Sequence, residues 1–258
     1  MRVARQITLL DFAWDRPGHG GTMALLRSVF AVIAVTTVAL IVPGHDASLQ
    51  AQATPNLSGI WQRTRSVTPE SDQLPLNARG IALREAIDES LAPMYDCVPA
   101  TIPHILGDPY NFSIEQQRDR VIFRFEKDAV TRTAWMNGRA ATPNDYALHG
   151  YSVAKYEGNT LVVDTRFYTF DPGGLEDKPP MTPSTTQKRT IERYTRSGDT
   201  LTVDVEMTDP LILKAPVKFQ FQFRPTKDAL VEWPECDLEQ ARAPINYMPV
   251  EQLKYGIR

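Results

Sequence analysis

The sequence predicts a mainly β protein, in which an antiparallel meander closes into a barrel and one short helix precedes the meander. Pro is in excess, with 20 Pro against 14 Gly among 258 residues, and this disfavours long helices. Short segments with alternating apolar and polar residues fill most of the chain after Phe112, and Gly-containing turns separate several of them. Closing such hairpins into a barrel removes exposed strand edges, while a two-sheet sandwich is the alternative.

The expected elements begin with a strand that opens at Gly59-Ile60-Trp61. Apolar residues recur at helical spacing over residues 77–91 and Pro93 ends the pattern, so this segment is the one expected helix. Four Pro residues between 93 and 111 are dense enough to prevent regular structure. A loop is therefore expected there.

About nine or ten strands are expected in all. After the loop they are residues 112–116, 120–126, 130–136, 151–156, 160–170, 186–195, 200–207, 217–224 and 229–233. Asn137-Gly138, residues 157–159 and residues 196–199 are expected hairpin turns, because Gly and Asn tolerate positive φ. A Pro- and Gly-rich loop over 171–185 and an irregular tail from Asp237 complete the chain.

An export signal is expected before the fold. Residues 29–42 are apolar and uncharged, Arg27 precedes them, and an A-x-A motif follows at residues 51–53. The apolar run is too short to span a bilayer comfortably. These features predict a signal peptide over residues 23–53, cleaved after Ala53, with an uncleaved anchor as the alternative. The protein is therefore expected to be periplasmic or secreted.

Residues 1–22 do not fit a signal peptide, so translation is expected to begin at Met23. The remaining chain, residues 54–258, is expected to form a single domain. The segment 1–53 holds four Arg and three Asp, which leaves 24 basic and 28 acidic residues, a net charge of −4. With this acidic balance, no nucleic-acid partner is expected. Oligomeric state is left open.

Cofactor and metal motifs are absent from the sequence. The chain after residue 53 contains two His, at positions 104 and 149, and lacks HExxH and paired CxxC motifs. It also lacks G-x-G-x-x-G, P-loop and G-x-S-x-G motifs. We therefore expect no cofactor and no metal.

Both cysteines, Cys97 and Cys236, lie in the part expected to be exported. Two cysteines in an oxidising compartment usually pair, so a disulfide is expected between the N-terminal segment and the last strand. A nucleophilic cysteine is the alternative. It is disfavoured because Pro99 and Pro103 separate Cys97 from His104.

Two motifs carry resemblances to known families. Residues 56–61, NLSGIW, resemble the G-x-W start of lipocalin-type (calycin) barrels, in which the Trp plugs one end. Residues 150–165, GYSVAKYEGNTLVVDT, resemble the GHSIGRWEGDTLVVDT pattern of a large family of secreted bacterial β-rich proteins. Further matching segments are Cys97-Val98-Pro99, Ile191-Glu192-Arg193-Tyr194, Asp199-Thr200-Leu201 and Thr208-Asp209-Pro210. The resemblance implies an exported barrel-like domain and no particular activity. Tyr151 and Tyr156 replace the usual His and Trp.

Polar side chains on inward strand faces are the candidate site residues. Catalytic roles are assigned to His149, which titrates near neutrality, and to the carboxylates of Asp164 and Glu192. Expected ligand-binding residues are Arg124, Tyr151, Arg166, Tyr168 and Tyr194. The alternative is that these residues form solvated outer faces with cross-strand ion pairs. The Pro-rich loops at 93–111 and 171–185 either cap a barrel mouth or link strands over an edge.

Three functions follow as hypotheses. A barrel of this size can hold one small ligand, so the chain is either a cofactor-free lyase or isomerase for a small aromatic or apolar compound, or a non-catalytic binding protein for an apolar ligand. The third hypothesis is a structural envelope protein with a packed interior. A carboxylate and His149 converging on a pocket would favour the enzyme, whereas an all-apolar cavity would favour binding.

Overall fold

The computed structural model describes residues 54–177, 181–231 and 236–246. The expected signal peptide and the expected start at Met23 lie outside these residues and stay predictions. The strands are β1 (Gly59–Val67), β2 (Phe112–Gln116), β3 (Arg120–Phe125), β4 (Thr131–Trp135), β5 (Tyr151–Glu157), β6 (Thr160–Arg166), β7 (Asp171–Glu176), β8 (Thr182–Ser184), β9 (Arg189–Ser197), β10 (Thr200–Thr208) and β11 (Val217–Thr226).

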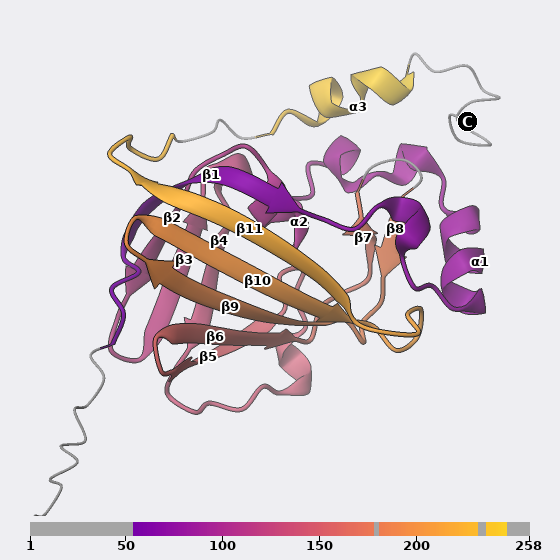
Figure 1. Cartoon of the computed structure of the whole chain (residues 1–258). Helices are drawn as coiled ribbons and strands as arrows, with labels where there is room; N and C mark the ends of the chain where they lie inside the picture. Colours follow the sequence, from indigo (N-terminus) through magenta and orange to yellow (C-terminus); the bar gives the residue numbers. More distant parts are fainter. Residues whose placement is uncertain (1–53, 178–180, 232–235, 247–258) are drawn as a thin grey trace, which may run out of the picture. The chain divides into compact units, whose positions relative to one another are not determined.

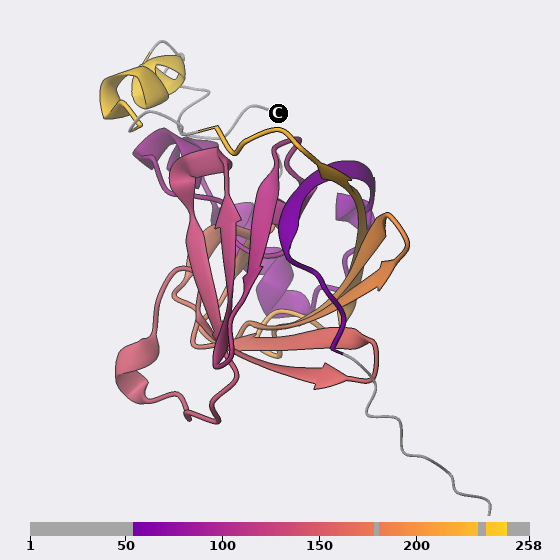
Figure 2. The ribbon, with the colours of Figure 1, turned by 90° about the vertical axis from the view of Figure 1, so that its left-hand side faces the viewer.

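Nine of these strands form a closed barrel in the order β1-β11-β10-β9-β6-β5-β4-β3-β2, and β7 and β8 form a separate two-stranded sheet (Figures 1 and 2). The barrel closes at β1, which pairs antiparallel with both β2 and β11. Closure leaves the barrel sheet without an unpaired edge. The expected mainly β barrel is confirmed.

One barrel pairing differs from the expected meander. β4 and β5 run parallel, with Ala134 opposite Ser152, so Asn137-Gly138 does not close a hairpin. Gly138 does take a positive φ of 73°. The chain instead uses residues 137–150 to return to the end of the barrel where β4 began, because two parallel strands need a crossover.

Trp61, near the start of β1, lies in the barrel core. Trp61 is buried, and its indole Nε1 donates a hydrogen bond to the Leu57 carbonyl at 2.9 Å. The Arg196 guanidinium lies 5.2 Å from the centre of its ring. Gln116 accepts a hydrogen bond from the Leu57 backbone N–H at 2.6 Å. This arrangement agrees with the plugging role implied by the G-x-W motif.

The barrel interior has an apolar half and a polar half. Aromatic rings pack in the apolar half, where Phe112 lies 4.9 Å from Phe223 and 5.3 Å from Phe125 between ring centroids. Inward residues of β10 and β11 in this half are Leu201, Val203, Val205, Met207, Val217, Phe219, Phe221 and Phe223. The polar half lies on β4, β5, β6 and β9 and is described with the site.

One end of the barrel, on the right in Figure 1, is covered by a cap of helices and the β7–β8 sheet. The helices are α1 (Ala78–Ala86), α2 (His104–Gly107) and short 3-10 turns at Ser71–Gln73, Glu89–Leu91 and Pro93–Asp96; further 3-10 turns lie at Lys127–Ala129 and Pro143–Asp145. The Asn77 side chain caps α1 by accepting from the Gly80 N–H at 3.0 Å. No helix in the described part of the chain is long and apolar enough to cross a membrane.

Five expectations are corrected. The segment 93–111, expected to lack regular structure, contains the 3-10 turn Pro93–Asp96 and the short helix α2. The helix expected over 77–91 ends at Ala86, and the loop expected over 171–185 contains β7 and β8. Residues 229–231 form no strand, and residues 232–235 are outside the described residues. The tail expected to be irregular contains the helix α3 (Leu238–Asn246).

The expected disulfide is confirmed, between Cys97 and Cys236. It joins the cap to the segment just before α3 rather than to the last strand, because β11 already ends at Thr226. An ion pair between Arg242 and Asp96 holds α3 at the same place. A disulfide of this kind is typical of chains exported into an oxidising compartment.

Candidate functional site

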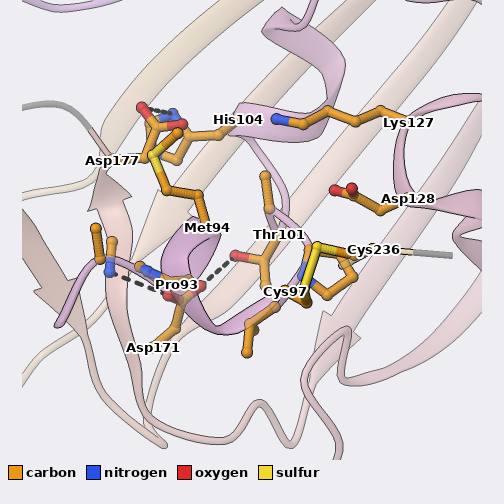
Figure 3. A pocket seen from close by; sticks show the side chains of 15 residues that line it. Pro93, Met94, Cys97, Thr101, His104, Lys127, Asp128, Asp171, Asp177 and Cys236 are labelled. Atoms are coloured by element: carbon orange, nitrogen blue, oxygen red, sulfur yellow. Dashed lines mark hydrogen bonds and ion pairs between the residues drawn. A yellow bond between two sulfur atoms is a disulfide. The ribbon is translucent and has the colours of Figure 1, made fainter. Parts of the chain in front are cut away.

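A cavity of about 270 Å³ lies within the cap, and we call it the cap pocket (Figure 3). One wall is apolar and is made by Ala92, Pro93, Met94, Val98, Pro99 and Ala100 together with the Cys97–Cys236 disulfide. The polar lining residues are Thr101, His104, Lys127, Asp128, Asp171 and Asp177. Both Pro-rich segments, 93–111 and 171–185, contribute residues to this pocket.

Local backbone geometry shapes the apolar wall. The 3-10 turn Pro93–Asp96 ends at Cys97, which takes a left-handed conformation with φ 56°. The Val98 N–H donates a hydrogen bond to the Pro93 carbonyl at 3.0 Å, and this bond closes a tight turn. The turn brings Pro93 and Val98 to the same side of the pocket and directs Cys97 toward its disulfide partner.

One histidine–carboxylate contact and one ion pair border the outer part of the pocket. His104 Nδ1 lies 3.7 Å from Asp177 Oδ1, and Lys127 Nζ lies 3.0 Å from Asp108 Oδ2. Burial raises the pKa of Asp108, and the Lys127 charge opposes that shift. Asp128 adds a further carboxylate on the Lys127 side of the pocket (Figure 3). This end of the pocket therefore offers hydrogen-bonding groups to one polar atom of a ligand.

The buried end of the pocket holds a chain of hydrogen bonds. The Thr101 hydroxyl donates to Asp171 Oδ2 at 2.8 Å and accepts from Lys188 Nζ at 2.8 Å. Lys188 also donates to the Gly174 carbonyl at 3.0 Å and lies 4.7 Å from the centre of the Tyr168 ring. Burial lowers the pKa of Lys188 to about 8, although nearby carboxylates oppose the shift.

The polar half of the barrel interior continues beyond Lys188. Tyr168 Oη and Thr190 Oγ1 share a hydrogen bond of 2.7 Å. Arg132 donates to both carboxylate oxygens of Glu192, at 2.8 and 3.1 Å, and Tyr194 Oη donates to Glu192 at 2.6 Å. The Arg132 and Glu192 side chains are 2% and 0% exposed, so this is a fully buried, two-pronged ion pair.

Three of the predicted site residues meet in this polar half. Glu192 and Tyr194 point inward from β9, as the period-2 alternation of that strand predicts. Tyr168 follows β6 and is also buried, although the alternation placed it with Asp164 and Arg166. The alternation breaks at Phe167, which has a positive φ of 62° and reverses the direction of the next side chain.

Asp164 and Arg166 lie on the outer face of the barrel, so the structure does not bring Asp164 to Glu192. Asp164 forms ion pairs with Arg166 and Arg189, at 3.1 and 2.8 Å. The inward side chains of β6 are Leu161, Val163 and Thr165, and Asp164 falls between them on the other face. This surface therefore matches the alternative expectation, in which these residues form a solvated outer face with cross-strand ion pairs.

Arg124 and Tyr151 also point away from the interior. Arg124 is exposed on β3 and pairs with Glu115 on β2 at 2.6 Å. Tyr151 is buried against the 137–150 segment, where its hydroxyl donates to the Arg139 carbonyl at 3.2 Å. Its neighbour on β5, Ser152, takes the inward position and bonds to Arg132. Neither predicted ligand-binding residue therefore faces a cavity within the barrel.

His149 is largely buried but does not line the cap pocket. Its Nδ1 is buried and has no hydrogen-bond partner within the part of the chain that the structure describes. Burial and the positive charges of Arg132 and Lys188 lower the pKa of His149 to about 4. The imidazole is therefore neutral near pH 7, rather than poised to titrate there as the sequence analysis assumed.

Four residues of the polar network were not predicted from the sequence: Thr101, Arg132, Asp171 and Lys188. Two of them carried a usable signal. Lys188 shares the period-2 face of Thr190 and Glu192, and Arg132 shares that of Ala134. Thr101 and Asp171 lie in segments expected to be loops, where no periodicity shows which way a side chain points.

Comparisons with known proteins give no family assignment. No family description and no curated protein matches the sequence. Among solved structures, the chain is similar to the wild-type fluorescent protein UnaG, with 15% identity, a TM-score of 0.33, and coverage of 66% of this chain and 96% of that one. It is also similar to Echinococcus granulosus fatty-acid-binding protein 1, with 11% identity, a TM-score of 0.33, and coverage of 66% of this chain and 96% of that one. A further similar structure is Caenorhabditis elegans lipid binding protein 8, with 9% identity, a TM-score of 0.34, and coverage of 66% of this chain and 94% of that one.

The function therefore has to be inferred from this chain's own residues. Within the described residues, no group of three or more His, Cys, Asp or Glu side chains is placed to hold a metal ion. The cap pocket combines an apolar wall with buried polar groups at one end. We take it as the candidate functional site.

Proposed function

We propose that the chain binds one small, largely apolar molecule in the cap pocket. The observation that carries the proposal is the cavity of about 270 Å³ with its apolar wall. A dry cavity of roughly 150 Å³ can hold a benzene molecule, and drug-sized ligands occupy roughly 300–1,000 Å³. The volume therefore suits a single aromatic ring with a short substituent, or a short aliphatic chain.

The lining of the pocket supports one polar group on this ligand. Pro93, Pro99 and Val98 offer rigid apolar surface, and Met94 is a flexible side chain that adapts to different shapes. Thr101, His104 and the nearby carboxylates supply hydrogen-bond partners at the other end. A ligand with an apolar body and one hydroxyl, carbonyl or amino group would match both parts.

The binding experiment starts from the purified protein and a panel of single-ring aromatic and short-chain compounds. A ligand at about 100 times its Kd stabilises the folded state by about 2.7 kcal/mol. For a domain of this size, that raises the melting temperature by roughly 5–11 °C. If no compound in the panel raises the melting temperature at saturating concentration, the pocket is not a binding site for this class.

A matched pair of variants locates the binding. Ala100 lines the cap pocket, whereas Ala140 is exposed in the segment between β4 and β5. Ala100→Trp should fill the cavity and abolish the ligand-induced rise in melting temperature. Ala140→Trp introduces the same side chain outside the pocket and should leave the rise unchanged. Equal responses of the two variants would place the ligand elsewhere.

The lyase or isomerase, the first function expected from the sequence, loses the residues proposed for it. Asp164 lies outside the barrel, Glu192 is fully engaged by Arg132 and Tyr194, and His149 is outside the cap pocket. Binding of an apolar ligand is therefore better supported than a lyase or isomerase reaction at those residues.

A further inference from the structure

The buried end of the cap pocket contains more polar and charged groups than an apolar ligand requires. Thr101 and Asp171 line the pocket, and Lys188 lies directly behind them. One hydroxyl oxygen, Thr101 Oγ1, lies 2.8 Å from both a carboxylate oxygen and an ammonium nitrogen. Both partners are held in place, Asp171 by the Gly173 N–H at 3.0 Å and Lys188 by the Gly174 carbonyl at 3.0 Å. Such oriented partners are the signature of an activated nucleophile.

Packing alone does not explain why a lysine occupies this position. Thr101 and Lys188 are each 1% exposed, and Asp171 is 5% exposed. Among the described residues, Lys188 forms no direct ion pair with a carboxylate; its partners are a hydroxyl, a carbonyl and an aromatic face. Burying an ammonium group with so little compensation is strongly unfavourable. A methionine of similar length would fill the same space without that penalty.

We propose that Thr101 is a nucleophile for acyl transfer, with Asp171 as its proton acceptor and Lys188 as the group that stabilises negative charge. The substrate class is a small ester with an apolar body. This inference rests on the proposed function, because the ester must enter the same cap pocket. It extends that function from binding to turnover by a residue set that the sequence analysis did not identify.

The reaction balances with these three residues and water. Thr101 Oγ1 attacks the ester carbonyl carbon while its proton passes to Asp171 Oδ2, and the C=O electron pair moves onto the carbonyl oxygen. The Lys188 ammonium, 2.8 Å from Thr101 Oγ1, stabilises the negative charge that develops on Oγ1 as its proton leaves. The C=O bond then re-forms, the bond to the alkoxy oxygen breaks, and Asp171 returns the proton to the departing alcohol. Water hydrolyses the acyl-Thr101 by the same route and releases the acid.

The role of Lys188 predicts a direction for the pH dependence. The carboxylates of Asp171, Asp209 and Glu192 favour the Lys188 charge, and Arg132 opposes it. The other titratable groups around Lys188 are His149 and Tyr168. The pKa of Lys188 is lowered to about 8 by burial, so the ammonium form is present below that value. The rate should therefore fall as the pH rises through about 8. A lysine acting as a general base would produce the opposite slope.

The test uses the purified full chain with p-nitrophenyl acetate as the ester. Release of nitrophenolate gives the rate, and peptide mass spectrometry locates the acetyl group. We expect acetylation of Thr101 and a rate that falls more than about 100-fold in Thr101→Val but is retained in Thr101→Ser. Thr131→Val, an exposed threonine on β4, is the matched control and should keep the wild-type rate.

The outcomes separate this inference from the binding proposal. If a panel ligand still stabilises the protein, but Thr101 is not acetylated and Thr101→Val hydrolyses the ester as fast as the wild type, Thr101 is not a nucleophile and binding stands. If no ligand stabilises the wild type, the binding proposal fails as well. Should Thr101→Val not fold, acetyl mapping and the pH profile of the wild type decide: no acetyl-Thr101, or a rate that rises through pH 8, overturns the inference.

Discussion

The buried ion pair between Arg132 and Glu192 should be a strong determinant of stability, and replacing one partner tests this. Glu192→Gln removes the carboxylate charge but keeps the size of the side chain. It leaves the Arg132 guanidinium, which is 2% exposed, in the barrel interior without its counter-ion. Breaking a buried pair in this way destabilises proteins by about 3–5 kcal/mol. Gln has one acceptor oxygen where Glu has two, so at least one donor of Arg132 or Tyr194 also loses its acceptor, and the upper part of that range is expected.

Urea denaturation, followed by circular dichroism, measures the effect as a lower midpoint at unchanged slope. The double variant Arg132→Met/Glu192→Met removes both charges and should recover most of the lost stability, because no unpaired charge stays buried. The exposed pair of Arg124 and Glu115 is the control, and Glu115→Gln should leave the urea midpoint close to that of the wild type, because solvent screens an exposed pair. A loss below about 1 kcal/mol in Glu192→Gln, or a double variant weaker than the single one, would refute the reasoning.

Three further predictions follow. The Cys97–Cys236 disulfide spans 139 residues of sequence, so reducing it should lower the free energy of unfolding by about 5 kcal/mol through the entropy of the unfolded chain. The same urea midpoint with and without reductant would contradict this. The pKa of His149 is lowered from 6.5 to about 4, so the unfolded chain binds the extra proton and stability should fall as pH falls from 6.5 to 4. His149→Gln should flatten that part of the melting-temperature profile, and an equally steep profile would disprove it. Asp164→Asn should leave ligand affinity unchanged, since Asp164 lies on the outer face, and a weaker titration would show otherwise.

The barrel was predictable because its strands alternate with few interruptions. On β9, Thr190, Glu192 and Tyr194 point inward as their spacing predicts. The strand pairing was less accessible, since Asn137-Gly138 has the local chemistry of a hairpin but β4 and β5 pair in parallel. Local propensity reports which turn a dipeptide tolerates, whereas the partner of a strand is decided by contacts made around the whole barrel.

The candidate site was harder to predict, because it lies in the cap rather than on the strands. Thr101 follows the 3-10 turn Pro93–Asp96, and Asp171 is the first residue of β7. Neither residue lies in a segment whose sequence shows a periodic pattern. The reversal at Phe167 likewise moves Tyr168 to the buried side against the alternation of β6. Charge alone was misleading on the barrel wall, where Asp164 pairs with arginines on the outer surface.

Titration calorimetry with the most strongly stabilising compound of the panel tests the cap pocket most directly. The wild type, Ala100→Trp and Ala140→Trp are titrated side by side. We predict saturable one-to-one binding to the wild type and to Ala140→Trp, and at least about tenfold weaker binding to Ala100→Trp, a difference of 1.4 kcal/mol or more. Equal affinity of all three proteins would contradict binding in the cap pocket.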